Sequence, residues 1–105
     1  MKAYAVGIIA STQFGDDIVD YLRSIDDTLA PFEGRYRMHG GPYDVLEGEW
    51  TSDLVVIEFP SMEMASGWYN SAAYSAIREL RQANTTGTVF LVNGVADTHR
   101  GSDLL

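Results

Sequence analysis

His39 is the residue of this sequence best suited to move a proton near neutral pH. The reference pKa of histidine is about 6.5, and His39 comes directly before the flexible Gly40-Gly41-Pro42 segment. Glu58 is the second candidate, because it is a carboxylate in an otherwise apolar segment, where a charge is costly unless it is paired. We take His39 and Glu58 as candidate catalytic residues. The alternatives are a strand-end histidine bound to backbone and a Glu58 that forms an internal ion pair with Arg35.

Arg35 and Arg37 precede His39 in the same predicted strand. Strict alternation places all three side chains on one face, where they could hold a carboxylate ligand through the bidentate donors of arginine. The alternative for Arg37 is the solvated face of an edge strand, which also discourages aggregation.

Aromatic residues with polar tips form the remaining candidates. Their hydroxyl and indole N–H groups need partners when buried, so such residues line pockets as well as cores. At helical spacing they are more often core residues. The candidate substrate-binding residues are Arg35, Arg37, Tyr4, Trp68, Tyr69 and Tyr74.

No cofactor and no metal site is expected. The chain has no cysteine, which excludes disulfides and thiolate ligands. His99 lies near Asp97 and Asp103, but in a segment without the regular structure that would hold metal ligands together. No phosphate-binding loop, serine elbow or dinucleotide fingerprint is present.

The elements that must position these residues follow the order β-α-β-β-α-β. We expect strands at residues 3–10, 35–39 with a continuation over 43–50, 54–59 and 88–93. One helix follows Gly15 and ends by Gly34, and a second begins after Ser61 with a break near Asn70. This order predicts an α+β, ferredoxin-like antiparallel sheet with two helices on one face. Residues 1–95 form the domain, and residues 96–105 are expected to be a disordered tail.

Both faces of the predicted sheet are apolar, although the helices cover only one of them. Six to eight exposed apolar side chains would form a patch larger than the few hundred Å² that monomers usually tolerate. Burial of each side chain contributes about 1.5–3 kcal/mol. Burying the whole patch therefore contributes on the order of 10 kcal/mol, which is comparable to the stability of a small domain. We therefore expect a homodimer in which two sheets pair around a two-fold axis.

Four motifs occur in a characteristic order. They are Glu33-Gly34-Arg35-Tyr36 with Gly40-Gly41, Val45-Leu46-Glu47-Gly48 with Trp50, Val56-Ile57-Glu58-Phe59-Pro60-Ser61, and Trp68-Tyr69-x-Ser71-x-x-Tyr74 with Arg81. Together they resemble the domain of unknown function 1330 family, within the dimeric α+β barrel superfamily, over roughly residues 3–95. His39 stands where relatives usually have arginine, and Ala72 where they usually have proline. The resemblance implies a dimeric α+β barrel with a cavity between sheet and helices or between subunits.

The charge of the chain limits its partners. A formal net charge of −8 disfavours nucleic acid and anionic membranes, because both require clustered Lys and Arg. The sequence lacks a signal-peptide pattern and any membrane-spanning stretch, so we expect a soluble, cytoplasmic protein.

Two functions remain open from the sequence. One is a cofactor-independent enzyme acting on a small organic acid or aromatic compound, an expectation by analogy with the fold. Here His39 would move a proton, Arg35 would hold an anionic group, and Glu58 would orient one of them. The alternative is a non-catalytic module that binds a metabolite or a protein partner.

Overall fold

The computed structural model describes residues 1–105 and shows a four-stranded antiparallel sheet with helices on one side. The strands are β1 (Ala3–Thr12), β2 (Arg35–His39), β3 (Asp53–Phe59) and β4 (Thr85–Asn93). The helices are α1 (Asp16–Leu29), α2 (Met62–Tyr69) and α3 (Ala72–Gln82), with short 3-10 helices η1 (Ala30–Phe32) and η2 (Gly101–Leu104). The sheet order is β2-β3-β1-β4, so the predicted ferredoxin-like plan is confirmed.

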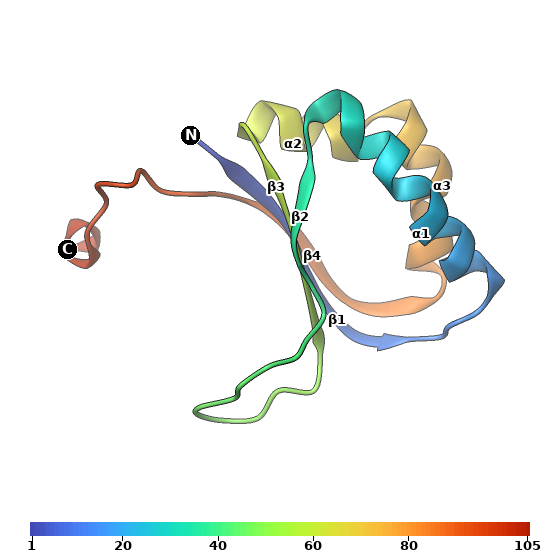
Figure 1. Ribbon diagram of the computed structural model, residues 1–105, viewed down its shortest axis with the longest axis horizontal. Coiled ribbons are helices and arrows are strands. Elements are labelled where there is room, and N and C mark those ends of the chain that lie inside the picture. The colour runs from blue at the N-terminus through green and yellow to red at the C-terminus, as the bar shows by residue number, and fades with distance from the viewer.

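Hydroxyl caps divide the second helical region where the sequence predicts a break. Ser61 accepts a hydrogen bond from the Met64 backbone N–H at 3.1 Å and begins α2. Ser71 accepts one from the Tyr74 backbone N–H at 3.1 Å and begins α3, directly after Asn70, the C-cap of α2. The break lets α3 run beside α1 while α2 lies over the sheet (Figure 1).

The core lies between the helices and one face of the sheet. Small residues on β1 leave room for the helices, which contribute an apolar stripe from α1 and an indole from α2. The most buried members of this layer are Ala3, Ala5, Ile25, Leu29, Ile57, Phe59, Ala65, Trp68 and Tyr74.

The opposite face of the sheet carries no helix (Figure 1). Strand alternation places on it Tyr4, Val6, Ile8, Leu54, Val56, Phe90, Val92 and Met38. Phe90 and Val92 each retain 41% exposure and Met38 retains 51%. We call this surface the bare face.

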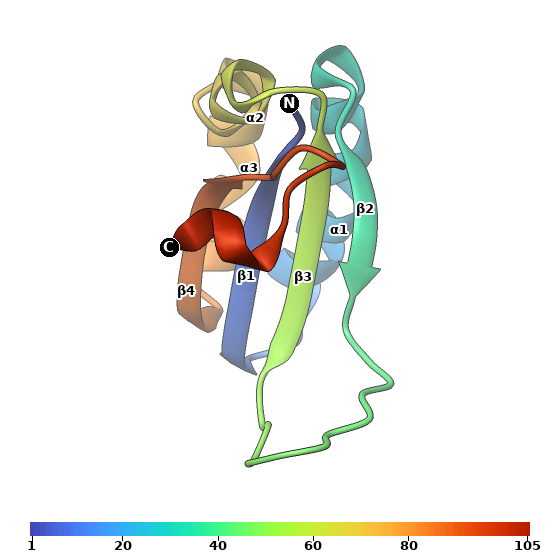
Figure 2. The same ribbon diagram turned by 90° about the vertical axis from the view of Figure 1, so that its left-hand side faces the viewer.

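Two segments project from the sheet on the side of the bare face. They are the loop between β2 and β3, residues 40–52, and a C-terminal arm, residues 94–105, that ends with η2 (Figures 1 and 2). The disorder expected for residues 96–105 stays a prediction. None of the helices combines the length and the apolar character needed to cross a membrane.

The second and fourth strands differ most from those predicted. Residues 43–50 do not continue the second strand, because the chain leaves the sheet at Gly40, with φ +82°, just before Pro42. The fourth strand begins at Thr85, although the sequence predicts a strand that starts at residue 88. Gly87 allows this extension: its φ is +155°, and its close approach to the Ile8 carbonyl at a β-bulge leaves no room for a side chain.

Candidate functional site

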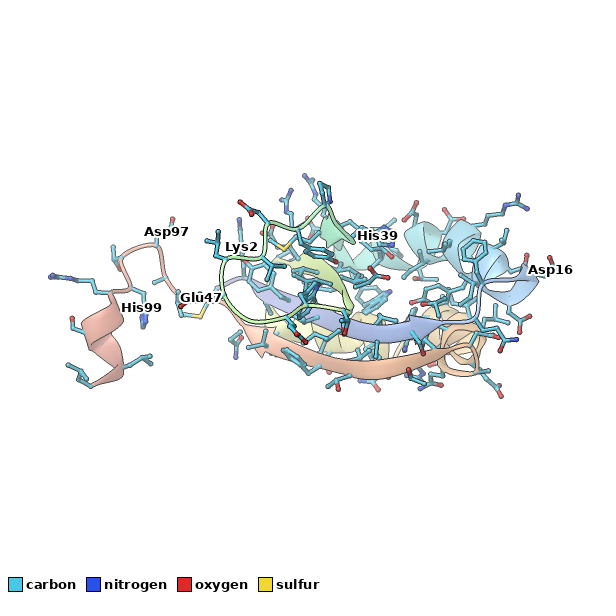
Figure 3. All side chains as sticks on the ribbon, turned by 90° about the horizontal axis from the view of Figure 1, so that it is seen from below. Lys2, Asp16, His39, Glu47, Asp97 and His99 are labelled. Atoms are coloured by element: carbon cyan, nitrogen blue, oxygen red, sulfur yellow. The ribbon has the colours of Figure 1, made fainter.

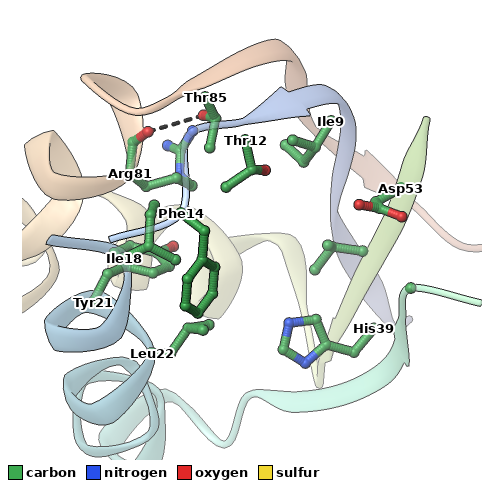
Figure 4. Close-up of a pocket in the computed structure, with 12 residues that line it drawn as sticks. Ile9, Thr12, Phe14, Ile18, Tyr21, Leu22, His39, Asp53, Arg81 and Thr85 are labelled. Atoms are coloured by element: carbon green, nitrogen blue, oxygen red, sulfur yellow. Dashed lines mark hydrogen bonds between the residues drawn. The ribbon is translucent and has the colours of Figure 1, made fainter. Parts of the chain in front are cut away.

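A cavity of about 350 Å³ lies between α1, the end of α3 and the helix-covered face of the sheet (Figure 4). This volume falls within the range of small-molecule pockets, about 300–1,000 Å³. Apolar side chains form half of the lining, and the polar groups among the remainder are Thr12, His39, Asp53, Arg81 and Thr85. The arrangement is therefore an apolar pocket with a few polar groups.

An adjoining inner chamber of about 80 Å³ extends toward the core. It shares Tyr21, His39 and Arg81 with the larger cavity. It also shares Ile9, Leu22 and Val55 with that cavity, and its other walls are mostly apolar. His39 and Arg81 thus stand where the two spaces meet, among apolar neighbours.

Arg81 brings a half-buried cation to this cavity from the last turn of α3. Its Nε donates to the Tyr74 hydroxyl at 3.4 Å, and no carboxylate lies within ion-pair distance. Burial, the largest single influence, acts to lower the pKa of Arg81, but the neighbouring Tyr74 and Tyr21 together outweigh it, so the net pKa is raised. The guanidinium therefore stays charged and has donors available for a ligand.

Two tyrosine hydroxyls lie beside Arg81. The Tyr21 and Tyr74 hydroxyls lie 2.7 Å apart and form a buried hydrogen bond. Burial, and then the proximity of Tyr74, raises the pKa of Tyr21 well above its ordinary value. Tyr21 consequently remains a neutral hydroxyl at physiological pH, next to the cation.

His39 reaches the cavity because β2 contains a register shift. Arg35 pairs with Glu58 and Tyr36 with Ile57, but Met38 then pairs with Val56, so Arg37 is an extra residue. The extra residue turns His39 to the helix-covered face, where it pairs with Val55 and stacks on Tyr36 with ring centroids 4.5 Å apart. Burial raises the pKa of Tyr36 above its ordinary value. His39 thus faces Arg81 across the cavity, as Figure 4 shows.

The same shift corrects the prediction that Arg35, Arg37 and His39 share one face. Arg37 lies on the bare face, where its guanidinium donates to Glu58 Oε2 at 3.0 Å. The Lys2 ammonium lies 3.6 Å from Glu58 Oε1. Glu58 therefore pairs with Arg37 and Lys2, and the alternative of an ion pair between Glu58 and Arg35 is wrong.

Glu58 and His39 consequently stand on opposite faces of the sheet. The hydrogen bond from Arg37 holds the pKa of Glu58 below its ordinary value, with further contributions from the charges of Arg37 and Lys2. Arg35, directly opposite Glu58, shares its face, as does Tyr4. The structure does not bring these residues to the cavity.

Two of the three aromatic candidates of α2 and α3 line the inner chamber, and the third lines a separate hollow. Trp68 and Tyr74 line the inner chamber, and each is at most 3% exposed. Trp68 Nε1 donates to the Thr28 hydroxyl at 3.0 Å, which satisfies its buried N–H. Tyr69 lines a smaller hollow on the other side of Arg81 and carries the Arg78 guanidinium 4.7 Å from its ring centre. Trp68 and Tyr74 therefore serve the core as well as the cavity.

The second histidine lies far from this site. Figure 3 shows Asp97 and His99 on the C-terminal arm, away from the sheet and from His39. His99 Nδ1 is 3.6 Å from Asp103 Oδ2, an i,i+4 contact within the arm.

Sequence reasoning missed Arg81, Tyr21 and Asp53 as cavity residues. A signal existed for two of them: Arg81 belongs to the motif set, and Tyr21 lies on the apolar stripe of α1 although it carries a hydroxyl. Asp53 gives no such signal, because an acidic residue before a strand is also typical of a turn.

Solved structures with the same fold differ widely from this chain in sequence. A protein of unknown function from Rhodopseudomonas palustris aligns with a TM-score of 0.66 and 14% identity, over 90% of this chain and 83% of its own. A dabb family protein with a ferredoxin-like fold from Mesorhizobium loti gives a TM-score of 0.55 and 8% identity, over 91% and 100%. SnoaB, a cofactor-independent oxygenase from Streptomyces nogalater, gives 0.53 and 14%, over 94% and 98%.

At these identities the similarity establishes the fold alone. No curated protein matches the sequence. One family profile, described as Domain of unknown function (DUF1330), matches residues 2–95. Because that match covers nearly the whole domain, the chain belongs to the domain of unknown function 1330 family.

Proposed function

We propose that this domain binds a small organic anion in the cavity and acts on it as a cofactor-independent enzyme. In this proposal Arg81 holds the anionic group and His39 exchanges a proton with the ligand. Tyr21 and Tyr74 position the guanidinium, and Asp53 supplies the carboxylate of the pocket in place of Glu58. The observation that carries the proposal is Arg81, a half-buried cation on the wall of a cavity of about 350 Å³ with no carboxylate partner.

The physical argument concerns the cost of a partly buried charge. A cation removed from water is stabilised by an opposite charge, and arginine offers paired donors that fit a carboxylate. The Tyr74 hydroxyl satisfies only one of these donors, at 3.4 Å. An acidic ligand would supply the missing charge and remaining acceptors. The fold of SnoaB, a cofactor-independent oxygenase, is compatible with such chemistry but supports it only by analogy.

Binding is tested with benzoate and its neutral analogue benzamide, which have nearly the same shape. We expect benzoate to bind the unaltered protein more tightly than benzamide, as measured by NMR titration. The Arg81→Met variant should lose about 10- to 100-fold in benzoate affinity, since hydrogen bonds to charged groups contribute about 1.5–3 kcal/mol. Its affinity for benzamide should change little.

Arg23→Met is the matched control, because Arg23 is exposed on α1 and outside the cavity. Equal benzoate affinities for the Arg81→Met and Arg23→Met proteins would refute the anion-binding role of Arg81.

The enzymatic part concerns proton transfer by His39. Incubating a panel of aromatic and keto acids with the protein in D₂O should produce C–H to C–D exchange that NMR detects. The His39→Gln variant should lose this exchange while it still binds the acid. Exchange that persists in His39→Gln would remove His39 from the mechanism.

The second candidate function is a non-catalytic metabolite-binding module. The observation in its favour is that the His39 side chain has no hydrogen-bond partner to orient its ring; it only stacks on Tyr36. Saturable binding without exchange for any acid of the panel would establish this function and exclude the enzyme.

We also infer that the domain is a homodimer that pairs through the bare face. The exposed apolar residues of that face support the inference, as do the loop and the arm that project beside it. The cavity lies on the other side of the sheet, so each copy would hold its own ligand.

A further inference from the structure

The middle of β1 carries a glycine that neither the backbone nor the packing requires. Gly7 is buried and pairs with Val55 on one side and with Val89 on the other. Its φ lies outside the left-handed region that favours glycine. A Cβ atom at this position would lie 3.5 Å from Ile9 Cδ1 and 3.7 Å from Val55 Cβ, which are ordinary contacts. Alanine would therefore fit.

The missing side chain opens the inner chamber. Glycine weakens a strand and often marks a place where a ligand comes close to the backbone. Gly7 lies on the helix-covered face, in one row across the sheet with His39, Val55 and Val89. All four residues of this row line the inner chamber. Part of its volume of about 80 Å³ is thus the space that a β1 side chain would otherwise fill.

The walls of the chamber favour an apolar occupant. Eleven of its 14 lining residues are hydrophobic, and the charged group among the other three, Arg81, also lines the outer cavity. The polar tips in these walls are largely engaged with one another: the Tyr21 and Tyr74 hydroxyls share a hydrogen bond, and the Trp68 indole N–H donates to Thr28. A buried water needs two to four polar partners, so a largely apolar wall holds an apolar group more readily than water. A polar ligand group placed there would lose its hydrogen bonds to water without replacement.

These observations indicate which end of the ligand should be apolar and which end should carry the charge. We propose that the site takes an amphipathic organic monoanion, with an aromatic or branched apolar end in the chamber over Gly7 and one acidic group on Arg81. This inference rests on the proposed anion-binding function and narrows its substrate class. Polyhydroxylated acids are disfavoured, because the largely apolar walls of the chamber would leave most of their hydroxyl groups without partners. Polyphosphates are disfavoured as well, because Arg81 is the one Lys or Arg residue lining the outer cavity and the chamber.

The test compares benzoate with acetate, which shares the carboxylate but lacks the ring. We expect the unaltered protein to bind benzoate at least 10-fold more tightly than acetate in NMR titrations. The Gly7→Val variant fills the chamber, so its benzoate affinity should fall to that of acetate while its acetate affinity stays within about twofold. Gly101→Val is the matched control, because Gly101 lies on the arm with nothing near its Cβ position.

The outcomes separate this inference from the proposal on which it rests. If the unaltered protein binds neither acid, the anion-binding function is wrong. If it binds both equally, or if Gly7→Val binds benzoate as the unaltered protein does, the anion-binding function stands and the apolar chamber does not select the ligand. If Gly7→Val fails to fold, Gly7→Ala replaces it, since its methyl meets only ordinary contacts. We then expect about a threefold loss of benzoate affinity, and no loss would overturn the inference.

Discussion

Arg81, Tyr74 and Tyr21 form a short chain of donors and acceptors at the residue scale. The guanidinium donates to one hydroxyl, and that hydroxyl is hydrogen-bonded to a second one that is buried. Because burial disfavours the ionised form of Tyr21 and raises its pKa, the Tyr21 hydroxyl stays neutral and does not cancel the charge of Arg81. The chain fixes the position of the cation without neutralising it.

The raised pKa values of Tyr21 and Tyr36 predict a loss of stability in alkali. Above the reference tyrosine pKa of about 10, the unfolded chain releases these protons and the folded protein retains them. The unfolded state then binds fewer protons, so the free energy of unfolding must fall as pH rises. We expect denaturant unfolding midpoints to decrease from pH 9 to pH 11, and less steeply in Tyr21→Phe. A 295 nm titration in which all six tyrosines of the chain ionise together near pH 10 would contradict this.

The sequence allowed part of the site to be predicted at this scale. His39 was predicted as a site residue and does reach the cavity. Strict strand alternation, however, predicts the wrong face for it, because the extra residue at Arg37 shifts His39 to the other face of the sheet. Glu58 stands out in the sequence because of its apolar neighbours, yet two cations outside the cavity pair with it. Chemical type can be recognised from the sequence, whereas the face a residue occupies depends on register, which single-residue patterns do not specify.

At the scale of helices and strands, boundaries were predicted correctly where the sequence contains a clear apolar stripe or a helix-capping residue. The apolar stripe of α1 and the serine caps of α2 and α3 are visible in the sequence and fix those helices. The segment 43–50 has apolar residues at strand-like spacing, but it follows Gly40-Gly41-Pro42 and forms a loop. Strand propensity therefore gave a wrong prediction for residues 43–50, where Gly40-Gly41-Pro42 turns the chain out of the sheet.

Gly34 sets the distance between η1 and the sheet, at the element scale. A Cβ atom at this position would lie 2.7 Å from Leu29 Cδ2 and 2.8 Å from Phe59 Cε1, and both side chains are buried. We expect Gly34→Ala to destabilise the protein by about 1–3 kcal/mol, because a packed core resists extra volume. Chemical denaturation measures the change.

Gly101→Ala is the control for this prediction. Its Cβ would meet nothing, so its unfolding free energy should stay within about 0.5 kcal/mol of the unaltered value. Equal stabilities for the two variants would show that η1 can move away from β3 without cost.

The whole molecule exposes one apolar sheet face beside two projecting segments. On a monomer this face would be an aggregation risk, so pairing with a second copy is the economical solution. Helices α1, α2 and α3 lie on the other side and do not obstruct such pairing, whereas the C-terminal arm with η2 stands on the side of the bare face (Figure 2).

A charge in the middle of the bare face should disrupt the dimer. Phe90 is 41% exposed on β4, and Phe90→Glu would bury a carboxylate without a partner. We expect its dimer dissociation constant to rise at least about 30-fold in sedimentation equilibrium, as for other central interface residues. Phe14→Glu is the control, since Phe14 lies at the cavity on the helix side. A monomeric unaltered protein at micromolar concentration would contradict the dimer.

The sheet also works as a partition. His39, Arg81 and the cavity lie on its covered side, while the opposite side carries the apolar surface that we propose to pair with a second copy. A substitution in β1 or β3 can change one compartment and spare the other, simply by falling on an odd or an even residue. Ligand preference and quaternary structure can therefore change independently in proteins with this fold. The extra residue at Arg37 already shows such a change, because it places the His39 side chain on the covered face instead of the bare face.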